Sequence, residues 1–150
     1  MKNLTNILTA LHQYLKQYHL LANGYENHLL AERLDEGMSE SLEDSIDRLK
    51  ELALGMGGPE ADTIAYAENS LSGALEELKI DINPSELTTT DTDKVLMNIG
   101  TFIKRYLEQA EAYSATLEGT IFKGSIDNAI FAIGEDMVRR AYLLNIQLNK

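Results

Sequence analysis

Residues 19–47 read HLLANGYENHLLAERLDEGMSESLEDSID, a stretch that holds two of the three histidines and the signals for two helices joined by a turn. It begins with a histidine, passes through a turn signal at Asn23-Gly24, and continues with apolar residues at every third or fourth position. The pattern predicts the end of one helix, a tight turn and a long second helix. The face of the second helix away from its apolar stripe carries carboxylates, namely Glu36, Glu43 and Asp47. Imidazole and carboxylate groups together can hold a metal ion, so the stretch is also the first candidate site.

The same helical periodicity extends over the rest of the chain. It predicts helices over residues 3–22, about 26–56 and 60–78, and two further helices whose apolar stripes run over residues 95–117 and 126–148. Gly37 lies inside the second of these, where it predicts the close approach of a neighbouring helix. Ser125 is expected to cap the last helix, and the segment DINPSE is expected to break the third helix at Pro84. We therefore expect an all-α protein, a single domain over residues 1–150, built as a four-helix bundle with a short helix in a crossover connection.

Composition excludes several classes of protein. The chain of 150 residues has no cysteine, so disulfides, thiolate metal sites and cysteine nucleophiles are excluded. Its formal charge of -11 and the lack of a Lys-rich start argue against DNA binding, because DNA affinity comes mainly from Lys and Arg. No stretch has the length and apolar character of a membrane span or a signal peptide. We expect a soluble, cytoplasmic protein that does not associate with membranes.

The motifs of common enzymes are absent from the sequence. It has no phosphate-binding Gly-rich loop and no nucleophile elbow, and Tyr25 stands three residues before His28 where an intrabundle di-iron site would have Glu. Glu43 and Asp47, four residues apart, share a helix face opposite the apolar stripe. We therefore expect them to point away from their own bundle, so that a twofold-related partner would have to supply the histidines.

Five features of the sequence resemble the Dps proteins and Dps-like miniferritins of the ferritin superfamily. They follow the order and spacing of that family over nearly the whole chain: YH at 18–19, HLLAERLDEG at 28–37, a carboxylate pair about one turn further on, GMGGPE at 55–60, and SIDNAIFAIGEDMVRRAYLLNIQL at 125–148. The resemblance implies a ferritin-like bundle that assembles with itself into a dodecameric shell. Such a shell binds ferrous iron at twofold interfaces, oxidises it with hydrogen peroxide or oxygen, stores the ferric product and protects against oxidative damage.

The resemblance also implies which residues form the ferroxidase site. His19 and His28 correspond to the two histidines, which act both as metal ligands and in catalysis. Glu43 and Asp47 correspond to the facing carboxylates, whereas counting back from the glycines of GMGG selects Asp47 and Glu51 instead. Helical periodicity places His12, one heptad before His19, on the same flank of the first helix as His19. His12 is either a plain flank residue, an additional ligand or a residue that supports a ligand.

Two features depart from the family pattern. The turn between His19 and His28 is shorter than usual, and Leu20 stands where the family typically has Trp. These departures motivate an alternative of another class, a structural or interaction bundle that has kept its assembly and lost its catalytic site.

Overall fold

The chain is all-α in the computed structural model, which describes residues 1–65 and 70–148, except for the side chains of residues 65 and 146–148. Helices account for 84% of these residues, and no strand occurs among them. The predicted fold class is therefore confirmed at this level. In the described part of the chain, no helix combines the length and the apolar composition that crossing a membrane requires.

The first helix, α1 (Lys2–Leu21), packs against neighbouring helices on several sides. The predicted apolar stripe from Leu4 to Tyr18 is buried, and so is a second line of residues that the stripe did not include: Ile7, Ala10 and Tyr14. The second line is covered because α1 packs against α3 on one side, against α6 on another, and against the short helix α5. After Leu21 the chain turns at Gly24, whose φ of 83° is the conformation that glycine adopts readily.

The long second helix has a wider turn within it. It consists of α2 (Tyr25–Leu34), a π-helical turn η1 (Asp35–Ser39) and α3 (Glu40–Met56), which follow one another without a break. Gly37 lies in the π turn, and a Cβ atom there would be 3.7 Å from Leu144 Cδ2 of α7. The carbonyl oxygen of Gly37 also accepts a hydrogen bond from Arg140 Nη1 at 2.7 Å. The predicted close approach of a neighbouring helix at Gly37 is thus confirmed.

Helices α6 (Thr92–Thr116) and α7 (Lys123–Leu148) form the other half of the molecule. Asp91 caps α6 by accepting hydrogen bonds from the backbone of Asp93 and Lys94. Helix α7 begins two residues before Ser125, so the prediction that Ser125 caps it is wrong. The turn before α7 is held instead by Lys123, whose ammonium group donates to Ser114 Oγ at 2.8 Å and to the Ser114 carbonyl at 3.1 Å.

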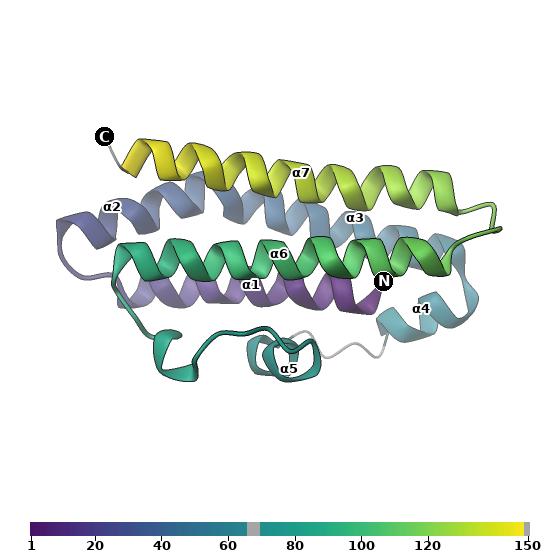
Figure 1. Ribbon diagram of the computed structural model, residues 1–150, viewed down its shortest axis with the longest axis horizontal. Helices are drawn as coiled ribbons and strands as arrows, with labels where there is room; N and C mark the ends of the chain where they lie inside the picture. Colours follow the sequence, from purple (N-terminus) through teal and green to yellow (C-terminus); the bar gives the residue numbers. More distant parts are fainter. Residues whose placement is uncertain (66–69, 149–150) are drawn as a thin grey trace.

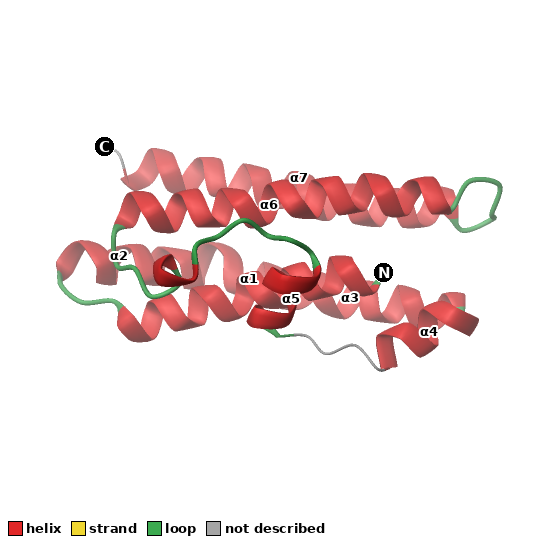
Figure 2. Cartoon of the chain, turned by 60° about the horizontal axis from the view of Figure 1, so that its bottom comes forward, coloured by secondary structure: helices red, strands yellow, loops and turns green. Residues whose placement is uncertain are grey.

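The connection between α3 and α6 crosses the length of the molecule. It contains α4 (Gly58–Ala65), α5 (Leu71–Glu77) and a 3-10 turn, η2 (Pro84–Glu86). The expected single helix over residues 60–78 is wrong, because Ser70 has an extended backbone and accepts a hydrogen bond from Gly73 N as the cap of α5. The part of that prediction at Ala67 lies outside the described residues. Because the connection returns along the molecule, α3 and α6 run in the same direction (Figures 1 and 2).

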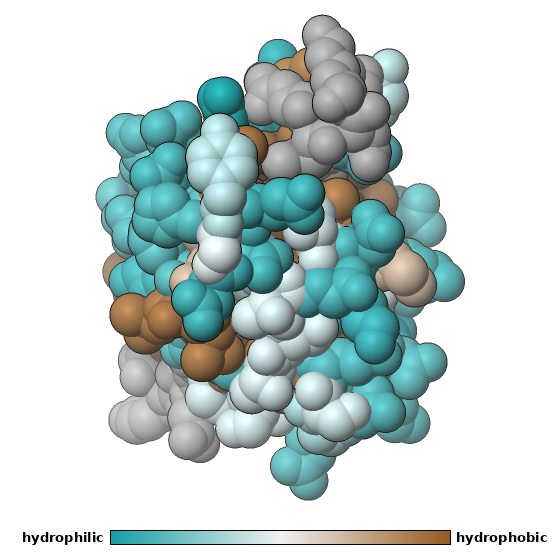
Figure 3. Space-filling view, turned by 90° about the vertical axis from the view of Figure 1, so that its left-hand side faces the viewer, coloured by the Kyte–Doolittle hydropathy of each residue, from teal (hydrophilic) through white to brown (hydrophobic). Residues whose placement is uncertain are grey.

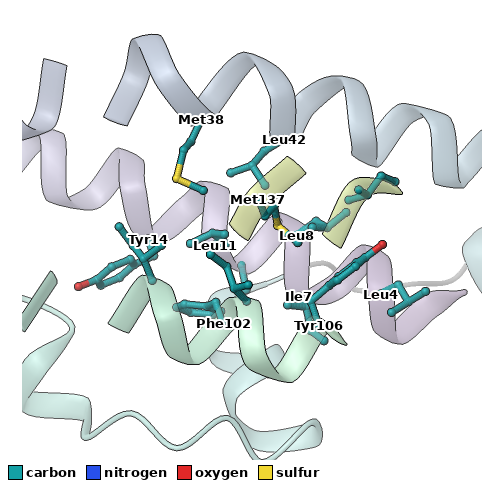
Figure 4. Packing of buried hydrophobic residues seen from close by; sticks show 14 of the residues in the cluster. Leu4, Ile7, Leu8, Leu11, Tyr14, Met38, Leu42, Phe102, Tyr106 and Met137 are labelled. Atoms are coloured by element: carbon teal, nitrogen blue, oxygen red, sulfur yellow. The ribbon is translucent and has the colours of Figure 1, made fainter. Parts of the chain in front are cut away.

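Four long rods, which are α1, the continuous segment α2–η1–α3, α6 and α7, enclose one hydrophobic core. Helix α1 packs against α3 and α6, and α7 packs against the same two helices, which closes a ring. Figure 4 shows how side chains from every rod meet inside it: Leu8 and Leu11 from α1, Met38 and Leu42 from η1 and α3, Phe102 and Tyr106 from α6, and Met137 from α7. The ends and outer faces of these rods therefore carry the polar side chains of the candidate site.

Candidate metal centre

Two histidines of α1 face the long second helix, which runs antiparallel to α1 (Figure 1). His12 Nε2 lies 3.2 Å from Glu43 Oε1 of α3, and His19 Nδ1 contacts Asp35 Oδ2 at the start of η1. We call these four residues, His12, His19, Asp35 and Glu43, the histidine seam. The prediction that His12 and His19 lie on one flank of α1 agrees with these contacts, since both reach the same neighbouring helix.

The contact between His12 and Glu43 contradicts the expected direction of the Glu43 side chain. Sequence reasoning placed Glu43 on a face directed away from its own bundle, yet its carboxylate reaches His12 of the same chain. The reason is that Glu43 lies at the edge of the apolar stripe, next to buried Leu42, and its flexible side chain extends over the flank of α1. The carboxylate itself is still open to solvent, because the Glu43 side chain is 59% exposed. A second copy could therefore still approach it.

His28 lies outside the seam, on the exposed surface of α2. Its Nε2 atom is 3.1 Å from Glu32 Oε1, one helical turn further along. Within one chain, His28 therefore shares no site with His19 or with Glu43.

The remaining predicted ligands are also exposed. Asp47 and Glu51 follow Glu43 on α3 at intervals of one turn, and neither forms an ion pair with another described residue. Across residues 1–65 and 70–148, no three His, Asp or Glu side chains gather closely enough to hold a metal ion. One chain thus supplies histidine–carboxylate pairs and separate carboxylates rather than a complete centre.

Tyr18 fixes the chain around His19. Its hydroxyl group lies 3.3 Å from both the carbonyl oxygen and the side-chain oxygen of Asn27, and Asn27 Nδ2 donates to the Asn23 carbonyl at 2.9 Å. Burial and, to a smaller extent, nearby Tyr14 raise the pKa of Tyr18 to about 12. Tyr18 therefore stays a neutral phenol at physiological pH and ties the end of α1 to the turn that leads into α2.

Sequence reasoning missed two carboxylates that contact histidines, Glu32 and Asp35. The spacing of four residues between His28 and Glu32 was a sufficient signal on a helix. The contact between Asp35 and His19 had no such signal, because it joins two different helices and depends on the π turn.

Apolar side chains are exposed at the end of the molecule where the seam finishes. Leu20 is 87% exposed and Tyr25 is 82% exposed, on either side of the turn between α1 and α2. Figure 3 looks onto this end, which is mostly hydrophilic and carries a small hydrophobic patch at the lower left. Grouped exposed apolar residues are typical of surfaces that contact another molecule.

Comparison of the chain with protein-family models, with characterised proteins and with solved structures finds no match.

Proposed function

We propose that the chain is a Dps-like miniferritin subunit with a ferritin-like four-helix-bundle fold. In this proposal, identical copies assemble into a dodecameric shell that takes up ferrous iron, oxidises it and stores the ferric product. The arrangement of the rods supports the fold, since ferritin-like bundles use one long crossover between their second and third long helices. The net charge of -11 supports the cargo, because an acidic shell attracts cations.

The distribution of ligands is the observation that carries the proposal. His28, Glu43 and Asp47 are exposed and His19 is half-buried, yet no three possible ligands meet within the described part of one chain. A twofold contact would complete two equal sites, each with histidines from one copy and carboxylates from the other. The exposed Leu20 and Tyr25 beside the histidines give such a contact apolar area to bury.

The contacts within the chain suggest how each imidazole would be oriented. Asp35 engages Nδ1 of His19, and Glu32 engages Nε2 of His28, which leaves the opposite ring nitrogen of each histidine for iron. Carboxylates that hold the second nitrogen of a metal-binding histidine are a common device for fixing the ring. In this site Asp35 and Glu32 are positioning residues, and Glu43 and Asp47 of the other copy provide the negative charge that favours ferric over ferrous iron.

Iron is the substrate of the proposed reaction. Two ferrous ions each release one electron, and one hydrogen peroxide molecule takes up both electrons with two protons to give two water molecules. Pairing the electrons in this way avoids the release of hydroxyl radical, which a one-electron step would produce. Oxygen is the alternative oxidant.

Stopped-flow measurement of ferric iron formation tests this function. Purified protein loaded with Fe2+ should oxidise it with hydrogen peroxide faster than buffer does. His19→Ala should slow the reaction at least about tenfold because a ligand is lost. Asp47→Asn should also slow it, whereas Asp44→Asn, the same change on the same helix, should not. An unaltered rate in His19→Ala, or no acceleration by the unaltered protein, would contradict the proposal.

The contacts of the histidines also favour a second candidate, a structural or interaction bundle that assembles without oxidising iron. Each histidine already contacts a carboxylate of its own chain, and Leu20 occupies the place of the Trp that the family typically has. Iron stoichiometry after loading separates the two candidates. A mineralising shell retains many iron atoms per chain, and a structural shell retains almost none.

A further inference from the structure

His12 is the most buried of the three histidines and has an unusual environment. The residue is 8% exposed, and its Nε2 atom makes no hydrogen bond with any other described residue. Buried polar atoms are almost always hydrogen-bonded, so an imidazole nitrogen in this state requires an explanation. Glu43 Oε1 lies 3.2 Å from this nitrogen, but the angles of the contact are not those of a hydrogen bond.

The separation of these two atoms suits a shared metal ion. Two ligand atoms about 2.0–2.2 Å from one ion, with bonds about 90–110° apart, lie about 2.8–3.6 Å from each other. The observed distance of 3.2 Å falls within that range. Glu43 is largely exposed whereas His12 Nε2 is closed to solvent, so an ion would enter as the flexible Glu43 side chain moves away from the imidazole.

We propose that His12 Nε2 and Glu43 Oε1 of the same chain bind one first-row divalent cation. A nitrogen ligand beside a carboxylate favours ions such as Fe2+, Mn2+, Co2+ or Zn2+ over Mg2+ and Ca2+, which prefer oxygen ligands alone. Asp47 lies one turn beyond Glu43 on α3 and is a further carboxylate on that face. Water molecules fill the remaining positions. His12 thereby joins the carboxylate half of the proposed centre, which the resemblance had left without an imidazole.

The identity of the ion as iron rests on the proposed function, but the pairing of His12 with Glu43 requires no second copy. Its test therefore uses Co2+, which binds without being oxidised under these conditions and reports nitrogen ligands through its visible spectrum. Co2+ is titrated into the purified full-length protein, and binding is followed by calorimetry and absorption.

The His12 variant separates this site from the one with His19 and His28, because Glu43 belongs to both proposed sites. We expect His12→Gln and Glu43→Gln each to weaken one Co2+ site per chain by about 10–100-fold and to change its visible spectrum. His19→Ala and Asp44→Asn should leave that site intact. Glu43→Gln replaces an exposed group and preserves the fold even if His12→Gln disturbs the packing around α1. If Glu43→Gln, or a folded His12→Gln, binds Co2+ as tightly as the unaltered protein, the inference is overturned.

The outcome is independent of the ferroxidase assay. Loss of iron oxidation in His19→Ala with an unchanged Co2+ titration in His12→Gln would support the proposed function and reject this inference. An inactive protein that still loses Co2+ affinity in His12→Gln would do the reverse.

Discussion

At the level of single residues, Asp136 of α7 is held by several hydrogen bonds from neighbouring side chains. Asp136 accepts hydrogen bonds from Arg140 Nε at 2.7 Å, from Ser41 Oγ at 2.8 Å and from Arg139 Nη2 at 2.9 Å. Burial alone would raise the pKa of this carboxyl group, but the hydrogen bonds outweigh it and hold the pKa below its usual value of 3.8. Asp136 therefore links α3 to α7 as a carboxylate.

The lowered pKa of Asp136 predicts a pH-dependent contribution to stability. A carboxylate whose pKa is lower in the folded state stabilises the fold above its unfolded-state pKa and loses that effect as pH falls through the folded-state value. The difference in free energy of unfolding between the unaltered protein and Asp136→Asn should be constant above about pH 5 and shrink below about pH 4. Urea unfolding between pH 6 and pH 3 measures it, and a difference that stays the same over this range would contradict the prediction.

The sequence could predict those parts of the candidate site that depend on the spacing of residues along one helix. Spacing correctly placed His12 and His19 on one side of α1, and it contained the pair formed by His28 and Glu32. It could not supply Asp35, because a contact between two helices depends on their packing and on the exact turn at which they meet. The prediction that Glu43 points away from its own bundle was wrong for a related reason. Periodicity gives the direction of a Cα–Cβ bond and not the reach of a long side chain.

At the scale of helices, the π turn explains an unusual spacing in the sequence. Residues at 30, 34, 38, 42 and 46 are all apolar and buried, although steps of four residues advance about 40° beyond a full turn of an ordinary α-helix. A π turn takes up this excess rotation, since its turns are wider. The constant spacing of four was therefore a signal for η1 that could have been used. The break at Ser70 had a weaker signal, because a serine at a cap and a serine within a helix differ only in the surrounding contacts.

Arg140 should be the main link between the π turn and α7. Its guanidinium group donates to the Gly37 carbonyl and to Asp136, both at 2.7 Å, whereas Arg139 contacts Asp136 from a side chain that is 67% exposed. Arg140→Ala should lower the free energy of unfolding by about 2 kcal/mol, since two hydrogen bonds with charged groups are lost. Arg139→Ala, the matched control, should cost less than about 0.5 kcal/mol. Equal losses in urea unfolding of the two variants would show that the Gly37 contact contributes little.

At the scale of the whole molecule, the crossing connection and the exposed ends of the rods determine how copies could meet. The order of the long helices and the presence of a crossover could be predicted from their periodicity and from the length of the segment between α3 and α6. The surface that contacts another copy could not be predicted, because an apolar residue in a turn has no periodicity to show whether it is buried. The structure identifies Leu20 and Tyr25 as exposed residues of this kind.

Assembly should depend on the apolar residue next to His19. Leu20→Asp places a charge in the proposed contact and should shift the protein toward smaller species in native mass spectrometry, with a parallel loss of iron oxidation. Asn23→Asp adds the same charge three residues away without removing apolar area, and it should preserve the full assembly. A full-sized assembly in Leu20→Asp would place the contact between copies elsewhere on the molecule.

The crossing connection also has a consequence for the order of folding. Helix α1 and the continuous segment α2–η1–α3 are neighbours in both sequence and space, and so are α6 and α7. Each pair is joined through a short turn and can form from local contacts. Contacts of α1 with α6 join residues far apart in the sequence, and the chain must close a long loop before they can form. Because distant contacts slow folding, docking of the two preformed hairpins is expected to be the slow step. The core in Figure 4, which draws on both hairpins, would then be completed last.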